Sequence, residues 1–269
     1  MSPAPPPAGA AVPAAPPTIP LQQVLFLDTN AMHYARLYHS FGRQHSLLPF
    51  GPSLEDPADA LRRVYAGRGF KIEGLERGLK YFSHLRDKSQ EGWRVEFAPM
   101  SRLELVCGLL KGHAIADAAG DGIALRMWSR IEEEEILGRL QLANYETVDR
   151  NTGELEDDFA KVGIELSETS PERIQEVWSL SKRLLSLVFL DAADCIVYAS
   201  ALLAEADELL TADGYLRMVA TAIENPGARP KQRAYFEQVK TRLIQLVAES
   251  IGVNAAAIAL PKAPKVGST

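Results

Sequence analysis

Four acidic side chains follow apolar runs at wide intervals along this chain of 269 residues. They are Asp28 in VLFLDTN, Glu104 in APMSRLEL, Asp194 in DAADCIVYASAL and Asp213 in ELLTADGY. A strand that ends in a carboxylate delivers it to the carboxyl edge of a sheet, where α/β proteins build their sites. Carboxylates that met there would repel one another unless a hard divalent cation neutralised them, and Mg²⁺ and Mn²⁺ prefer such oxygen ligands. The pattern predicts metal-dependent chemistry on a phosphate.

Each acid also has a structural explanation when it is taken alone. Asp28 could cap a helix and Asp213 could be an ordinary turn residue. Glu104 and Asp194 could be first-turn carboxylates that the helix dipole favours. The conjunction of the four at one expected edge favours a site. Asp191 lies one turn before Asp194 and competes with it for the third position, although the apolar register of the helix favours Asp194.

Short apolar runs predict the strands that must position these acids, and helical spacing predicts the segments between them. The expected strands are 24–27, 94–98 and 208–211, and 151–167 is expected to be irregular. The expected helices are 31–41, 57–66, 72–88, one opening at Pro99, 123–138, one from Ser170 to about 187, 190–206 and 231–249. Strands that alternate with helices predict an α/β fold with a mostly parallel sheet between helices. Right-handed crossovers would bring the ends of the first and last strands together.

The composition fits a soluble globular protein, with 46% apolar and 24% charged residues. No apolar run approaches the roughly 18 residues that a membrane helix needs. The first charged side chain is Asp28, so the N-terminus lacks the basic start of a secretory signal. Cys107 and Cys195 lie in apolar helical patterns, which buried free thiols explain better than a disulfide or a zinc site. We therefore expect a cytoplasmic protein with no membrane segment.

The net charge of −6 argues against a protein that holds nucleic acid by bulk electrostatics alone. Residues 61–90 differ from the rest of the chain, because this segment contains eight basic and only three acidic residues, with aromatic residues among them. This segment could cradle a phosphate backbone and stack on bases. A solvated helix face is the favoured alternative. The candidate substrate-binding residues in it are Arg62, Arg63, Arg68 and Lys71.

The motifs around the four acids resemble those of a known family. Asp-Thr-Asn follows the first strand, Ser-x-x-Glu opens a helix, an Asp precedes Ile-Val-Tyr-Ala-Ser-Ala-Leu, and Thr-x-Asp follows the last strand. This order is similar to that of the PIN domain nucleases, many of which are the toxins of bacterial toxin–antitoxin pairs. The resemblance covers 24–41, 97–112 and 192–216, well under half of the chain.

The resemblance implies a three-layer α/β/α fold, a Mg²⁺ or Mn²⁺ site and the hydrolysis of RNA phosphodiester bonds. Carried over by position, Asp28, Glu104, Asp194 and Asp213 would be both the metal ligands and the catalytic acids. Asn30 and Thr211 would hold the ligating carboxylates or water in place by hydrogen bonds without contacting the metal. Asp191 would do the same if it is not itself a ligand. RNA would be the substrate, and an antitoxin chain or a second copy of the chain would be the protein partners.

The spacing departs from that of the compact toxins. Asp28 and Glu104 lie 76 positions apart, and Glu104 and Asp194 lie 90 apart, whereas the gap of 19 to Asp213 is typical. We therefore expect a Pro/Ala-rich leader at 1–20 and a PIN-like domain at 21–225 with helical insertions around 43–92 and 112–188. A helical extension at 226–260 and a loose tail at 261–269 would follow.

Two other functions compete with a metal-dependent endoribonuclease. The first is a PIN-like scaffold module that binds RNA or protein without catalysis. The second is a phosphatase with an Asp nucleophile, because Asp-Thr-Asn is similar to the opening of such enzymes. Their second acid lies two positions after the first, where this chain has Asn30, and this disfavours the phosphatase.

Overall fold

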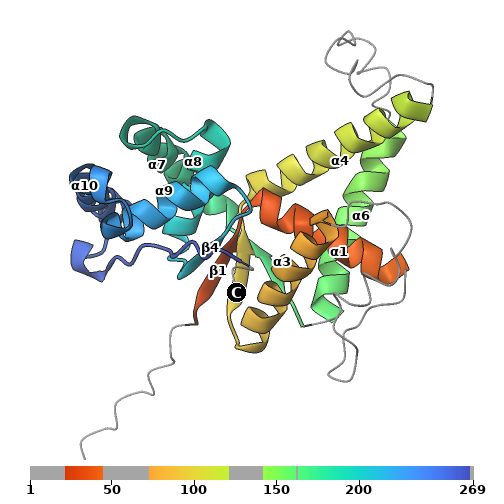
Figure 1. The fold of residues 1–269 in the computed structure, drawn as a ribbon, viewed down its shortest axis with the longest axis horizontal. Coiled ribbons are helices and arrows are strands. Elements are labelled where there is room, and N and C mark those ends of the chain that lie inside the picture. The colour runs from red at the N-terminus through yellow and green to blue at the C-terminus, as the bar shows by residue number, and fades with distance from the viewer. Residues whose placement is uncertain (1–21, 45–72, 121–141, 162, 267–269) are drawn as a thin grey trace, which may run out of the picture.

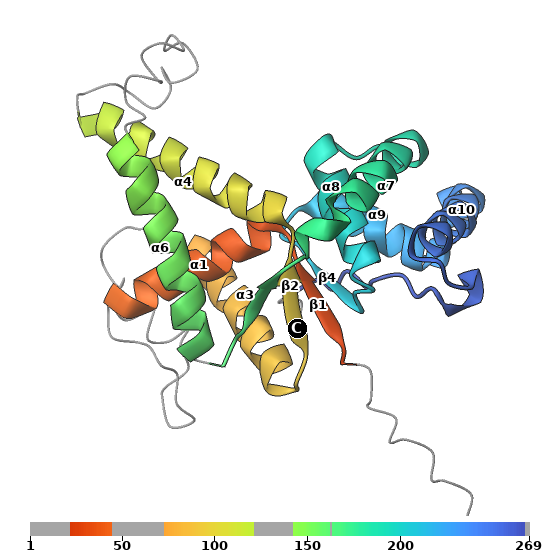
Figure 2. The same cartoon turned by 180° about the vertical axis from the view of Figure 1, so that it is seen from behind.

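The computed structural model describes residues 22–44, 73–120, 142–161 and 163–266. In this part of the chain, four parallel strands lie between two layers of helices (Figure 1 and Figure 2). The sheet has the order β3-β2-β1-β4. The strands are β1 (Val24–Leu27), β2 (Arg94–Phe97), β3 (Leu166–Glu168) and β4 (Glu208–Leu210). The predicted fold class, α/β with a small parallel sheet between helices, is confirmed.

The helices divide between the two faces of the sheet. One layer is formed by α1 (Thr29–Gln44), α3 (Glu73–Gln90), α4 (Pro99–Gly120) and α6 (Leu142–Lys161). The other is formed by α7 (Ile174–Leu187), α8 (Ala192–Leu203), α9 (Gly214–Glu224) and α10 (Arg233–Ile251).

Strand β1 separates two hydrophobic cores, because successive side chains of a strand point to opposite faces of the sheet. Leu25 and Leu27 belong to the core that includes α1 and α3, whereas Val24 and Phe26 belong to the core with α8, α9 and α10. All four residues are buried, as expected for a central parallel strand covered on both faces. The apolar run therefore places Asp28, the next residue, at the edge of the sheet.

Helix α3 lies tightly against α1, and Gly78 makes the contact possible. A Cβ atom on Gly78 would lie 2.5 Å from the carbonyl oxygen of Tyr34 and 2.9 Å from the Cβ of Tyr38. The ring of Tyr81, on the same helix, stacks on Tyr34 with ring centroids 6.0 Å apart. This packing holds Tyr81 beside the end of β1.

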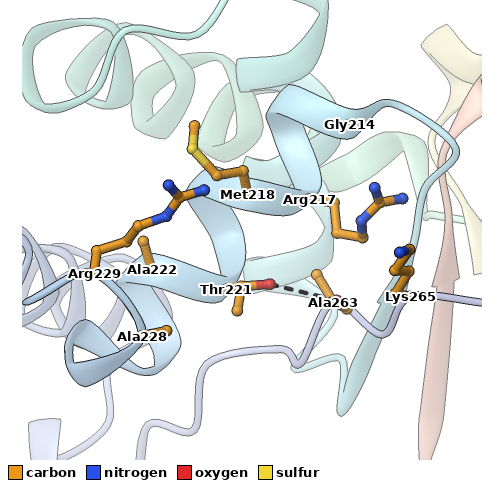
Figure 3. Close-up of a pocket in the computed structure, with 9 residues that line it drawn as sticks. All are labelled: Gly214, Arg217, Met218, Thr221, Ala222, Ala228, Arg229, Ala263 and Lys265. Atoms are coloured by element: carbon orange, nitrogen blue, oxygen red, sulfur yellow. Dashed lines mark hydrogen bonds between the residues drawn. The ribbon is translucent and has the colours of Figure 1, made fainter. Parts of the chain in front are cut away.

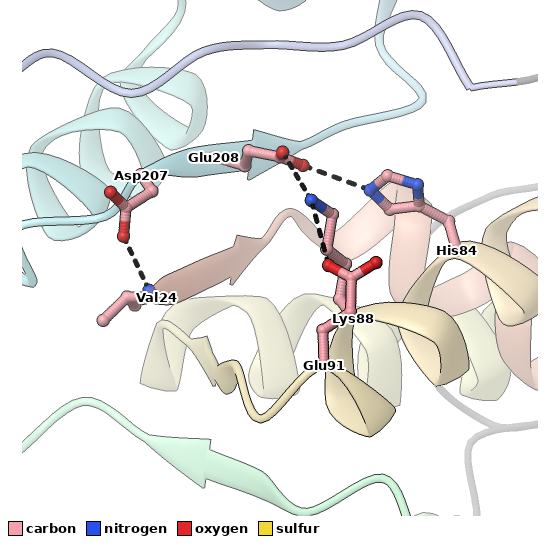
Figure 4. Close-up of polar contacts among 6 residues, drawn as sticks. All are labelled: Val24, His84, Lys88, Glu91, Asp207 and Glu208. Carbon is pink, nitrogen blue, oxygen red and sulfur yellow. Dashed lines mark hydrogen bonds and ion pairs between the residues drawn. The ribbon is translucent and has the colours of Figure 1, made fainter. Parts of the chain in front are cut away.

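Polar contacts fasten the amino end of β4 to its neighbours (Figure 4). Asp207 accepts a hydrogen bond from the backbone N–H of Val24 at 2.9 Å. Glu208 bonds to Lys88 at 2.8 Å and to His84 at 3.2 Å, both on α3. Burial would raise the pKa of Glu208, but these two hydrogen bonds lower it below its ordinary value. These contacts fix the position of β4, and Asp213, the last acid of the motif, follows this strand by three residues.

The segment that follows α10 packs against β4. The N–H of Leu209 donates to the carbonyl of Lys262 at 2.7 Å, and the N–H of Lys262 donates to the carbonyl of Asp207 at 2.9 Å. Leu260 is buried in the core. The expectation of a loose tail after residue 260 is therefore wrong for residues 261–266, because an exposed strand edge offers them backbone partners.

Several predicted elements agree with the structure and others do not. Strand 24–27 is confirmed, and the strands expected at 94–98 and 208–211 are each one residue shorter. The irregular segment expected at 151–167 is wrong, because α6 continues to Lys161 and residues 166–168 form β3. Cys195 is buried as expected, but Cys107 is exposed. The helices expected at 57–66 and 123–138 lie outside the described residues.

In the described residues, no single helix has the length and apolar composition of a membrane span. The pair formed by α7 and α8 meets these criteria only when it is taken together across a bend of 120°.

The close approach at Gly78 predicts a loss of stability in the Gly78→Ala variant. The added methyl group meets backbone atoms of α1, so the two helices must separate, and such overpacking costs about 1–3 kcal/mol. Urea unfolding followed by circular dichroism measures the effect.

Gly108→Ala is the matched control, because a Cβ at this exposed position of α4 meets no described atom within 4 Å. The higher helix propensity of Ala is expected to stabilise this variant by roughly 0.5–1 kcal/mol. Equal effects of the two substitutions would contradict the tight packing of α1 against α3.

Candidate metal centre

The pairing of β1 with β4 brings the first and last motifs together. The backbone N–H of Asp28 donates to the carbonyl of Leu210 at 3.0 Å, which extends the ladder by one residue. The hydroxyl of Thr211, fully buried, donates to Oδ2 of Asp28 at 2.7 Å. The same hydroxyl oxygen accepts the backbone N–H of Asp213 at 2.9 Å. Thr211 therefore orients both acids, the supporting role that the sequence predicted for it.

Asp28 carries a buried carboxyl group, and burial disfavours its ionised form. Its residue exposure is 3%. Burial raises the pKa of Asp28 to about 6, and the nearby charges of Glu104 and Asp213 add to this effect. Hydrogen bonds from the Thr211 hydroxyl and the Thr29 backbone act in the opposite direction. A cation bound beside Asp28 would remove most of the cost of ionising it.

Glu104 reaches the same edge from α4. The hydroxyl of Thr29, the residue after Asp28, donates to Oε2 of Glu104 at 2.5 Å. Pro99 opens α4 directly after β2, so Glu104 lies in its second turn. Ser101, in the first turn, is fully buried, and its hydroxyl has no partner among the described residues.

Asp191 and Asp194 have different places at the start of α8. Asp191 is the N-cap of this helix, and its Oδ1 accepts the backbone N–H of Asp194 at 2.8 Å. Asp194 is half-buried, and burial raises its pKa to about 7. The charges of Asp191, Asp213, Asp28 and Glu104 raise it further, in that order of size. The charges of the other three acids thus reach Asp194, and the side chain of Asp191 bonds to its backbone.

Asp213 has a structural role as well as a position at the site. It is the N-cap of α9, and its Oδ1 accepts the backbone N–H groups of Tyr215 at 2.7 Å and Leu216 at 2.8 Å. Two backbone donors on one oxygen hold the carboxylate in place. No hydrogen bond from a described residue occupies Oδ2, which leaves this oxygen for a ligand.

The four acids therefore come from four separate segments and influence one another electrostatically. Within the described ranges, however, no three Asp, Glu, His or Cys side chains are already arranged closely enough to hold a metal ion. The donor types suit a hard cation such as Mg²⁺ or Mn²⁺, because all four are carboxylates. Burial, together with the charges of the neighbouring acids, raises the pKa values of Asp28 and Asp194.

The other residues predicted from the sequence are not placed at the site by any contact in the described part of the chain. Asn30 is exposed and makes no hydrogen bond with another described residue, so no contact assigns it the supporting role. The candidate substrate-binding residues Arg62, Arg63, Arg68 and Lys71 lie outside the described residues.

Two residues near the acids were not identified from the sequence. Tyr81 is buried, and its hydroxyl donates to the carbonyl oxygen of Thr211 at 3.1 Å. Burial raises the pKa of Tyr81, whereas the charge of Arg217 on α9 lowers it, so Arg217 lies close to this end of the site. Tyr81 precedes Arg217 by 136 positions, and no sequence motif links them.

No protein-family model, curated protein or solved structure matches the chain.

The raised pKa of Asp28 predicts how the stability of the metal-free protein depends on pH. A carboxyl group whose pKa rises on folding, from 3.8 to about 6, stabilises the fold at low pH, and this contribution is lost as the pH increases through about 6. The Asp28→Asn variant lacks this dependence. Its free energy of unfolding in EDTA should therefore increase relative to the original protein by about 1–3 kcal/mol between pH 4 and pH 8. Parallel stability curves from urea unfolding would contradict the raised pKa.

Thr211→Val is expected to destabilise the protein, because it removes the donor to Asp28 and the acceptor for the Asp213 N–H. The loss of a buried hydrogen bond to a charged group costs about 1.5–3 kcal/mol. Thr211→Ser keeps the hydroxyl and is the matched control, with a smaller loss from the missing methyl group. Equal destabilisation by both substitutions, measured by urea unfolding at pH 8, would show that packing matters here and the hydroxyl does not.

Proposed function

We propose that this chain is a metal-dependent endoribonuclease that hydrolyses RNA phosphodiester bonds with Mg²⁺ or Mn²⁺. The observation that carries the proposal is that acids from four segments lie at one edge of a parallel sheet, where Thr29 bonds to Glu104 and Thr211 bonds to Asp28 and to the backbone of Asp213. The charges of these three acids also raise the pKa of Asp194. Sites of α/β proteins form at this edge. The resemblance of the four motifs to PIN domain nucleases supports the same activity.

The roles of the residues follow from their contacts. Asp28, Asp213 and Asp194 would hold the cation, with Thr211 orienting the first two and Asp191 fixing the start of α8 beside the third. The cation, when bound, would lower the pKa of a water molecule and polarise the phosphate. Glu104, held by Thr29, would orient the attacking water or hold a second cation.

A scaffold module that binds RNA or protein without catalysis is the second candidate. It is favoured by one observation: the described acids do not form a ready ligand group. Metal-dependent cleavage separates the two functions, because a scaffold with idle acids does not cut.

The first prediction of the proposal concerns the metal and the acids. The purified protein should cleave at least some members of a set of labelled RNAs in Mn²⁺ or Mg²⁺ and none in EDTA. Asp28→Asn and Asp194→Asn should each reduce the rate by about 100-fold or more, because each removes a metal-binding charge. Gel analysis of the products with time measures the rate.

Asp191→Asn is the matched control for Asp194→Asn. Asn caps helices about as well as Asp, so α8 should start normally and cleavage should stay within roughly 10-fold of the original rate. Loss of activity in Asp191→Asn with full activity in Asp194→Asn would exchange the roles of these two residues. Full activity in Asp28→Asn would exclude Asp28 from the site and would contradict the proposal.

The protein partners are further parts of the proposal. If the chain is the toxin of a toxin–antitoxin pair, a separate antitoxin chain would cover the acidic edge. Assembly into a homodimer can be tested by size-exclusion chromatography with light scattering.

A further inference from the structure

A basic hollow lies beside the acidic edge, at the start of α9 (Figure 3). Its volume is about 510 Å³. Gly214 and Arg217 line it from α9, Arg229 lines it from the turn after α9, and Ala263 and Lys265 line it from the C-terminal segment. No acidic side chain is among the described residues that line it. In a chain with a net charge of −6, three cationic side chains around one hollow indicate an anionic ligand.

A second hollow lies next to the first. Ala228 and Arg229 line both, and the second, of about 500 Å³, adds Lys231 and again no acidic residue from the described part of the chain. Arg217 and Arg229 form no ion pair with any described residue. Two neighbouring hollows with cations along them suit an extended polyanion better than a single anionic group.

The first hollow is close to the acids. Gly214 directly follows Asp213 in the chain. A guanidinium nitrogen of Arg217 lies 3.9 Å from the position that a Cβ on Gly214 would occupy, so the charge stays near the first turn of α9. The charge of Arg217 also acts on Tyr81, whose hydroxyl bonds to Thr211. A strand with one phosphate at the acids would therefore pass into the basic hollow.

The C-terminal segment completes the wall of the hollow. The pairing of Lys262 with β4 and a hydrogen bond of 3.4 Å from the Thr221 hydroxyl to the carbonyl of Ala263 hold this segment against α9. Arg229, Lys231 and Lys265 all lie outside the segments that resemble PIN domain nucleases.

We propose that the two neighbouring hollows bind the phosphates of the RNA strand next to the bond that is cut, with Arg217 nearest to the acids and Arg229 and Lys231 further along. This inference rests on the proposed ribonuclease function for its substrate. The binding surface itself is defined by the hollows and their charges.

The test measures binding and cleavage separately. A fluorescein-labelled single-stranded RNA of 12 nucleotides is titrated in EDTA by fluorescence anisotropy between 50 and 300 mM NaCl. The variant carries Arg217→Gln, Arg229→Gln and Lys231→Gln. Because each lost phosphate contact on a single strand lowers the slope of log K against log salt by about 0.7, the slope should fall by about 2, and affinity at low salt should fall by roughly 10-fold or more.

The control variant removes three exposed positive charges elsewhere, by Lys182→Gln, Arg183→Gln and Arg242→Gln, none of which lines either hollow. Both triple variants have the same net charge, so general attraction to RNA weakens equally in both. Thermal unfolding by circular dichroism checks that each variant is folded. The single Arg229→Gln variant, at an exposed position, repeats the binding test with least disturbance of the fold.

Selective loss of RNA affinity and salt slope in the hollow variant supports the inference. Equal affinities of the two triple variants, or no RNA binding by the original protein, overturn it. Cleavage of the same RNA in Mn²⁺ reports on the proposed function independently. If the hollow variant binds and cleaves RNA as well as the original protein, the inference about the hollow is wrong and the proposed ribonuclease function stands. If the original protein binds RNA through the hollow but does not cleave it, the inference about the hollow stands and the proposed ribonuclease function is wrong.

Discussion

A carboxyl group buried at the end of a central strand constrains the structure around it. Asp28 can ionise at this position only if donors and positive charge compensate for the water that it has lost. The Thr211 hydroxyl and the Thr29 backbone supply part of that compensation. The negative charges of Glu104 and Asp213 oppose it. A cation bound at the proposed site would supply the positive charge that an ionised Asp28 lacks.

Structural and chemical roles are combined in the same residues at this edge. Asp213 caps α9 and Asp191 caps α8, and Asp194 lies in the first turn of α8, as its structural explanation expected. The caps also position the carboxylates, because a helix that starts at the edge of a sheet directs its first residues towards the ends of the strands. The N-terminal ends of α8 and α9 add favourable partial charges for anions. For these acids, capping and function are therefore compatible explanations.

The sequence predicted the elements whose signal is local. VLFL is buried on both faces and forms an uninterrupted apolar run, so β1 was predictable to the residue. Strand β3 is a partly exposed edge of three residues, so it produces no clear apolar pattern. That Asp191 caps α8 became clear only from the geometry of the helix start. The basic hollow combines Arg217 with Lys265, which only the paired C-terminal segment brings together.

The hydrogen bond between Thr211 and Asp28 also has a consequence for folding, because it joins residues 183 positions apart. Strand β1 is made early in synthesis, yet both of its neighbours in the sheet come later in the chain, and β4 comes last. Contacts of such long range form slowly, because a large loop must close before they contribute any stability. A nascent chain that has not reached residue 211 has neither the hydroxyl nor the backbone partners that complete the acidic edge. For the proposed ribonuclease, this order of assembly means that the acidic site cannot be complete before Asp213 has been synthesised.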